Sequence, residues 1–158
     1  MNGFDKLNEF ELALIKGSAY SNLNNIDKAS ERYTFALSLF PNNTRALNSL
    51  SALYLQTNQL PQAKSLIAKS IAVNNQNPRT IHLQGQLAKL DNMPLEALKL
   101  FEAAYALSPK NPIFMRSLAT AYSQVGDERA IDIVNKILAQ TPNDPFASLL
   151  LGLSLIHI

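Results

Sequence analysis

The chain has 158 residues, of which 47% are hydrophobic and 16% are charged, and its formal net charge is +2. This composition supplies enough apolar side chains for a continuous core, which excludes a globally disordered chain. The absence of cysteine excludes disulfides, thiolate metal sites and a cysteine nucleophile.

Short helical segments separated by turns follow one another along the chain. Each segment has about a dozen residues with apolar side chains at helical spacing. One series of turns, spaced by 34, 34 and 33 residues, lies at 41–43, 75–77, 109–111 and 142–144. A second series lies midway between them, at 24–25, 57–58, 91–92 and 126–127. The sequence therefore predicts an all-α fold of alternating helices and turns.

Capping residues mark where these helices begin. Asn77, Asn111 and Asp144 each precede a proline, which fits the first helical position because its missing amide is not needed there. Asn58 and Asn92 are expected to cap the second helix of their repeats.

Aligning the segments gives one array over residues 1–158. It consists of four repeats and a half repeat, at 10–43, 44–77, 78–111, 112–144 and 145–158. The eighth repeat position holds the small residues Gly17, Ser51, Gly85 and Ala119. The eleventh holds Tyr20, Tyr54, Ala88 and Tyr122, and the twentieth holds Ala29, Ala63, Ala97 and Ala130. Small facing residues allow two antiparallel helices to approach closely, and the large ones fill the space around that contact.

This pattern resembles the tetratricopeptide repeat family over nearly the whole chain. The resemblance implies a right-handed superhelical solenoid of antiparallel helix pairs whose first helices line a concave groove. The chain departs from the family pattern at Asn75, Ala88 and Ile137, and its fourth repeat is one residue short. Its composition also resembles long bacterial lipoproteins of exopolysaccharide and protein-export systems, which would imply the periplasm; otherwise the cytoplasm is the default, and the sequence leaves the compartment open.

The half repeat, 145–158, is apolar nearly all round, and its longest apolar stretch is too short to span a bilayer. Two interpretations remain open. Either this helix packs on the fourth repeat of a longer array, or a second copy covers it and produces a homodimer or higher oligomer. The residues predicted for that oligomer interface are Leu149, Leu150, Leu153 and Ile156.

No catalytic arrangement is visible in the sequence. Its two histidines, His82 and His157, fall on well-separated helices, and no acidic residue lies near His82 in the sequence. No ligands occur at metal spacing, and neither Gly85 nor Gly126 belongs to a phosphate-binding loop. We therefore expect no enzymatic activity, no cofactor and no metal.

The function is instead expected in the groove, whose face follows from helical periodicity and the family resemblance. The predicted ligand-binding residues are Arg45, Asn48, Gln56, Arg79, His82, Gln86, Lys89, Arg116, Thr120 and Gln124. Three of these, Arg45, Arg79 and Arg116, could form a row that grips carboxylates, because a guanidinium can bind a carboxylate with two hydrogen bonds. The alternative is that they are solvated arginines on an ordinary polar face.

These residues predict a scaffold that binds a protein or peptide segment, extended and possibly acidic. Some members of the family clamp the carboxyl terminus of a chaperone, but only Arg79 matches a basic position of that clamp. The other clamp positions hold Leu14, Ser18, Ser49 and Leu83, which argues against binding of a chaperone tail.

The alternative function is binding of an anionic polymer, a polysaccharide or a nucleic acid. No acidic residue occurs between Glu31 and Asp91, so region 32–90 is expected to carry a positive potential. Its basic residues are Arg32, Arg45, Lys64, Lys69, Arg79 and Lys89. Six scattered charges in a nearly neutral chain are few for nucleic acid, which favours the peptide-binding hypothesis.

Overall fold

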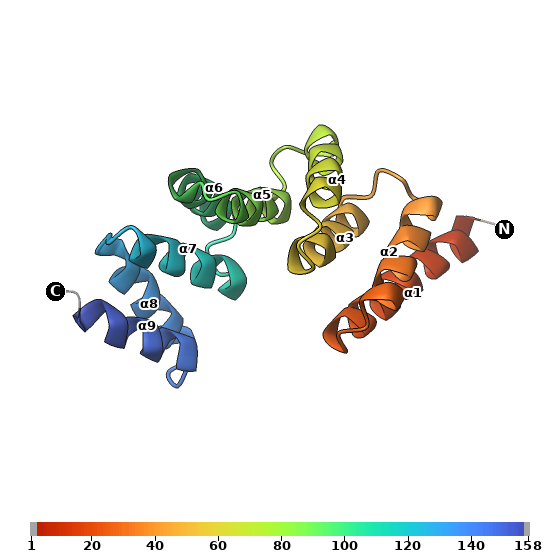
Figure 1. Cartoon of the computed structure of the whole chain (residues 1–158). Helices are drawn as coiled ribbons and strands as arrows, with labels where there is room; N and C mark the ends of the chain where they lie inside the picture. The colour runs from red at the N-terminus through yellow and green to blue at the C-terminus, as the bar shows by residue number, and fades with distance from the viewer. Residues whose placement is uncertain (1–2, 157–158) are drawn as a thin grey trace. The chain divides into compact units, whose positions relative to one another are not determined.

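The computed structural model describes residues 3–156, and all nine regular elements in this range are α-helices. In chain order (Figure 1) they are α1 (Gly3–Asn22), α2 (Ile26–Leu39), α3 (Thr44–Gln56), α4 (Leu60–Val73), α5 (Pro78–Leu90), α6 (Pro94–Leu107), α7 (Pro112–Gln124), α8 (Arg129–Gln140) and α9 (Pro145–Ile156). The predicted all-α fold is confirmed for these residues. His157 lies outside them.

Asparagines define both kinds of turn, in different ways. Asn43 and Asn111 are N-caps, and the side-chain oxygen of Asn111 accepts a hydrogen bond from the amide of Ile113 at 2.9 Å. The prediction that Asn58 and Asn92 are also N-caps is wrong. Both have positive φ angles, 57° and 59°, and lie in the turn that follows the first helix. Asparagine suits this left-handed conformation better than most residues with a side chain.

The helices form two compact units that divide between Leu83 and Gln84, inside α5. In the first unit, α1 pairs with α2, α3 pairs with α4, and α2 contacts α3. In the second unit, α7 pairs with α8, α6 packs on α7, and α9 packs on both α7 and α8. Each unit is thus a stack of neighbouring helices with its own apolar core.

Two helix pairs are held by an aromatic ring that lies over a glycine. A Cβ atom added to Gly17 would lie 2.5 Å from Cε1 of Tyr33, and one added to Gly85 would lie 2.6 Å from Cε1 of Phe101. Both rings are buried, at 5% and 3% exposure. The glycines are therefore required by the close approach of the rings.

The other two full repeats have a different combination at the same two positions. Ser51 and Ala119 replace the glycines, and the aliphatic residues Ile67 and Val134 replace the rings. All four residues are buried. A larger residue on the first helix thus accompanies a smaller one on the second, which conserves the volume between the helices.

The terminal helix α9 is anchored to its own unit. Asp144 is its N-terminal capping residue: its carboxylate accepts a hydrogen bond from the amide of Ala147 at 3.0 Å and forms an ion pair with Arg116. Ala147 and Leu150 lie in the apolar core beside α7 and α8. Leu150 is only 8% exposed, so its predicted place in an oligomer interface is wrong. Leu149 and Leu153 are 66% and 45% exposed, and the side chain of Ile156 is not described.

Replacing Gly85 by alanine should destabilise the chain, because the new methyl group would displace the Phe101 ring. We expect the free energy of unfolding to fall by about 1–3 kcal/mol, as is common for overpacked cores. Urea denaturation followed by circular dichroism measures this change.

The matched control is Gly152→Ala, at the same repeat position in α9. A Cβ atom at Gly152 meets nothing within 4 Å, and alanine has the higher helix propensity. This variant should be neutral or up to about 1 kcal/mol more stable. Equal effects of the two substitutions would contradict the ring-over-glycine account.

Candidate ligand-binding hollow

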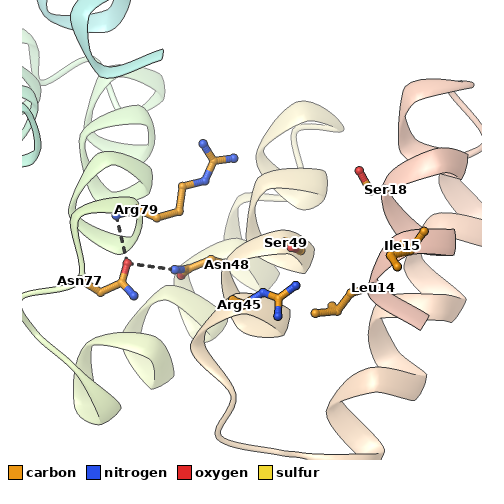
Figure 2. Close-up of a pocket in the computed structure, with 8 residues that line it drawn as sticks. All are labelled: Leu14, Ile15, Ser18, Arg45, Asn48, Ser49, Asn77 and Arg79. Carbon is orange, nitrogen blue, oxygen red and sulfur yellow. Dashed lines mark hydrogen bonds between the residues drawn. The ribbon is translucent and has the colours of Figure 1, made fainter. Parts of the chain in front are cut away.

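An open hollow of about 370 Å3 lies in the first unit, between α1, α3 and the start of α5. Figure 2 shows its three sides. Its lining residues are Leu14, Ile15 and Ser18 from α1, Arg45, Asn48 and Ser49 from α3, and Asn77 with Arg79 at the start of α5. The hollow combines an apolar side with hydroxyl, amide and guanidinium groups, a mixture suited to a peptide.

Two of the three predicted arginines line this hollow, and they differ in their pairing. The Arg45 guanidinium donates two hydrogen bonds to the Glu11 carboxylate, at 2.7 and 3.1 Å. Arg79, by contrast, has no carboxylate within 4.0 Å among residues 3–156. Arg79 is therefore a cation at the hollow without an acidic partner in the described part of the chain.

Arg79 is also partly buried, which raises the cost of its charge. Burial lowers the pKa of Arg79, and the nearby Tyr33 opposes that shift. Burial likewise raises the pKa of Tyr33, while Ser18, through a side-chain hydrogen bond, and Arg79 oppose the rise. The phenol, the Ser18 hydroxyl and the guanidinium thus lie close together beside the hollow. An anion docked there would restore interactions that the guanidinium lost with water.

The third predicted arginine, Arg116, belongs to the second unit and is paired. It forms an ion pair with Asp144, and its guanidinium lies 5.5 Å from the centroid of the Phe146 ring. Arg116 therefore stabilises the start of α9 through its ion pair with Asp144. The structure brings only Arg45 and Arg79 together in one hollow.

A buried polar junction supports the side of the hollow formed by α5. Asn48 donates a hydrogen bond to the Thr80 hydroxyl at 3.0 Å, and the hydroxyls of Ser70 and Thr80 are 2.9 Å apart. Asn77 caps α5 by accepting from the amides of Arg79 and Thr80, at 3.0 and 3.2 Å. The junction fixes the first turn of α5 against α3 and α4, and thereby positions Arg79. Asn48 lines the hollow, but its side-chain amide is hydrogen-bonded within this junction.

His82 does not line the hollow, contrary to the sequence-based prediction. Its side chain is fully buried. Burial, with a smaller contribution from the positive charge of Arg79, lowers the pKa of His82 to about 4. The imidazole is therefore neutral at physiological pH and acts as a core residue.

The remaining predicted groove residues lie outside the hollow. Gln56, Lys89 and Gln124 are exposed, and Gln86 is half-buried. Thr120 donates a hydrogen bond to the carbonyl oxygen of Arg116 within its own helix, at 2.8 Å. None of these five contributes to the lining around Arg79.

A second hollow lies in the second unit, over α6, α7 and α8. Several of its polar groups are bonded within the chain: Tyr122 donates to Glu102 at 2.7 Å, and Arg129 donates to Glu102 at 3.0 Å and to Asp127 at 2.7 Å. Lys136 similarly contacts the Tyr105 hydroxyl at 3.3 Å. The hydrogen-bonding groups of Tyr122, Glu102 and Arg129 are thus already used within the chain. The first hollow, whose Arg79 has no acidic partner among the described residues, is therefore the better candidate site.

The predicted ligand-binding residues left out five residues that line the hollow: Leu14, Ile15, Ser18, Ser49 and Asn77. The sequence identified Asn77 as a helix cap but not as part of the hollow. It also gave no sign that Tyr33 lies near Arg79. A usable signal did exist for the arginines. Glu11, Arg45 and Arg79 occupy the same repeat position at intervals of 34 residues. The residue one repeat before Arg45 is Glu11, which is acidic and can pair with it. The residue one repeat before Arg79 is Arg45, which is basic and cannot.

Within the described residues, no helix is long and apolar enough to cross a membrane. The same part of the chain holds no group of three or more His, Cys, Asp or Glu side chains that could bind a metal ion.

Comparison with known proteins identifies similar sequences and folds. The sequence model of the family described as Tetratricopeptide repeat matches residues 19–87 and 90–152. The chain is 26% identical over 147 residues to the anaphase-promoting complex subunit CDC16 of Saccharomyces cerevisiae, a match that covers 87% of this chain but 17% of that protein.

Among solved structures, the chain resembles Pseudomonas aeruginosa pilF with a TM-score of 0.83 and 18% identity, over 97% of this chain and 70% of the other. It also resembles the first TPR domain of Spaghetti (RPAP3) bound to the HSP90 peptide SRMEEVD. That TM-score is 0.64 at 19% identity, over 76% of this chain and 95% of the other. At these identities the two structures show a shared fold.

The buried His82 should make stability depend on pH. The pKa of His82 is lower in the folded chain (about 4) than in an unfolded one (about 6.5). The contribution of His82 to the free energy of unfolding is therefore present above pH 6.5 and is lost as the pH falls towards 4. We expect this contribution to be about 3 kcal/mol across that window. Urea denaturation at several pH values measures it.

The variant His82→Gln should show a flatter dependence over the same window. Asp144, whose pKa is lowered chiefly by the hydrogen bond from the Ala147 amide, loses its contribution at lower pH and is unchanged in this variant. A wild-type imidazole that titrates near 6.5 in an NMR experiment, assigned by comparison with the variant, would contradict the account.

Proposed function

Because this chain belongs to the tetratricopeptide repeat family, we propose that it is a scaffold that binds an extended segment of another protein in the hollow between α1, α3 and α5. The hollow supplies apolar contacts through Leu14 and Ile15 and polar contacts through Ser18, Ser49 and Arg79. An extended segment exposes its backbone groups and alternate side chains, which such a mixed surface can contact.

The observation that carries this proposal is the state of Arg79. Its guanidinium is partly buried at the edge of the hollow and has no carboxylate partner in the described part of the chain. We infer that the ligand provides a carboxylate, from an acidic side chain or a free carboxyl terminus. Arginine is well suited to this task because its planar donors match the two carboxylate oxygens.

A similar protein supports an acidic peptide as the ligand. The peptide in the Spaghetti (RPAP3) structure, SRMEEVD, contains two glutamates and an aspartate. This chain differs from the family's chaperone-tail clamp at Leu14, Ser18, Ser49 and Leu83, so we propose an acidic peptide as the ligand and not that particular sequence. Since the chain spans only 17% of CDC16, partners of that assembly are not carried over.

Binding of an anionic polymer to region 32–90 receives less support. Two of the six basic residues there are paired within the chain, Arg32 with Glu31 and Arg45 with Glu11. Internal pairing reduces the number of cations that could release counterions from a polymer.

Fluorescence anisotropy with labelled octapeptides tests the proposal. The probes alternate apolar residues with glutamate, glutamine or lysine, and each is made with a free and an amidated carboxyl terminus. We expect the glutamate peptides to bind best. Arg79→Gln should weaken that binding by about tenfold to a hundredfold, the usual effect of losing a charged hydrogen bond.

The matched control is Lys69→Gln, which removes one positive charge from the exposed surface of α4 and should leave binding within about twofold. Equal losses in both variants, with a steep dependence on salt, would support polymer-like binding instead. Unchanged binding by a folded Arg79→Gln variant would refute the site.

A further inference from the structure

The candidate hollow has two ends along α1, and each end holds one arginine. At one end the Arg45 guanidinium bonds to Glu11 of α1. At the other end Ser18 shares a side-chain hydrogen bond with Tyr33, and Tyr33 lies near Arg79. Figure 2 shows the two arginine side chains extending in different directions from α3 and α5. The two guanidinium groups therefore lie at different parts of the hollow.

The spacing of these two ends follows from helix geometry. Glu11, Ile15 and Ser18 lie on one side of α1, at intervals of four and three residues. The axial distance from Glu11 to Ser18 is about 10 Å, which an extended peptide covers in about three residues. Ile15 lies between them, lines the hollow and is 63% exposed. A segment that lies along α1 thus contacts a polar end, an apolar centre and a second polar end.

The two ends differ in the positive charge that they offer to a ligand. Both terminal nitrogens of Arg45 donate to Glu11, at 2.7 and 3.1 Å, so the two carboxylate oxygens occupy the planar donors of the guanidinium. This pair has no net charge, and a ligand carboxylate beside it would meet the like charge of Glu11. Arg79 has no carboxylate within 4.0 Å among residues 3–156. A second acidic residue of a ligand therefore gains nothing at the Arg45 end.

Glu11 contributes little to the fold itself. The side chains of Arg45 and Glu11 are 63% and 40% exposed, and an ion pair between such exposed groups adds little to stability. The packing of α1 depends instead on its buried residues, among them Phe10, Ala13 and Gly17. A substitution at Glu11 therefore tests recognition in the hollow with little effect on folding.

We propose that Glu11 is a specificity-determining residue of the hollow. Because it neutralises Arg45, the hollow selects a segment with one acidic residue, bound at Arg79. An uncharged residue about three positions away in that segment lies beside the Glu11–Arg45 pair. This inference rests on the proposed function, since it requires a peptide in the hollow. It adds which of the two arginines recognises the acidic group and what kind of residue the other end accepts.

Fluorescence anisotropy with labelled nonapeptides, capped at both ends, tests this inference. Each peptide alternates leucine and serine around a central glutamate. A second glutamate replaces, one at a time, the residues two, three or four positions to either side. We expect the wild-type chain to gain less than about twofold in affinity from any second glutamate. Glu11→Gln should gain about threefold to tenfold from a second glutamate three residues away, in one of the two chain directions, because the freed guanidinium can bind it.

Two further variants serve as controls. The double variant Glu11→Gln/Arg45→Gln should lose the gain, because the gain requires the Arg45 guanidinium. Glu9→Gln removes an equal charge from an exposed position of α1, on the opposite side of the helix from Glu11, and should bind every peptide like the wild type. Circular dichroism checks that each variant remains helical.

Three outcomes would overturn the inference. They are an equal gain from the second glutamate in the wild type and in Glu11→Gln, no gain in a folded Glu11→Gln at any spacing, and a gain that persists in the double variant. All three leave the proposed function standing if the single-glutamate peptide binds the wild type and loses affinity for Arg79→Gln. If that peptide does not bind, or binds Arg79→Gln equally well, the site itself is refuted, and the role of Glu11 with it.

Discussion

The structure depends on close contact between a small residue on one helix and a large one on its partner. Where the small residue is Gly17 or Gly85, an aromatic ring lies directly on the helix backbone. This contact sets the distance between the two helices of a pair. No single pair encloses a core of its own, so the apolar faces that the pair leaves exposed are buried against the next pair.

The charge available to a ligand at the hollow depends on which arginines already form ion pairs within the chain. Arg45 and Arg79 occupy the same repeat position, yet only Arg45 has a glutamate one repeat before it. Arg116 is likewise committed to Asp144, at the start of α9. Arg79 thus differs from the other two by its missing partner and its partial burial, and these two features make it the best candidate to contact a ligand.

The hollow also depends on a polar junction in the apolar interior. Asn48, Ser70 and Thr80 are buried and bonded to one another, where the first repeat has Leu14 and Ala36 at the positions of Asn48 and Ser70. Directional hydrogen bonds fix the start of α5 more strictly than apolar contacts would, which gives Arg79 a defined position. Three polar residues at core repeat positions were visible in the sequence, but their mutual pairing was not.

The sequence by itself determined the helices, the spacing of the turns, the small residues at the contacts and the family, because helical periodicity and backbone-specific residues act locally. It also identified Arg45, Asn48 and Arg79 as candidates. Only the tertiary structure decided that His82 and Leu150 are buried, that Arg45 and Arg116 are paired, and that Gly152 is open. Burial and ion pairing depend on residues brought together from different repeats, and periodicity within one helix does not specify those neighbours.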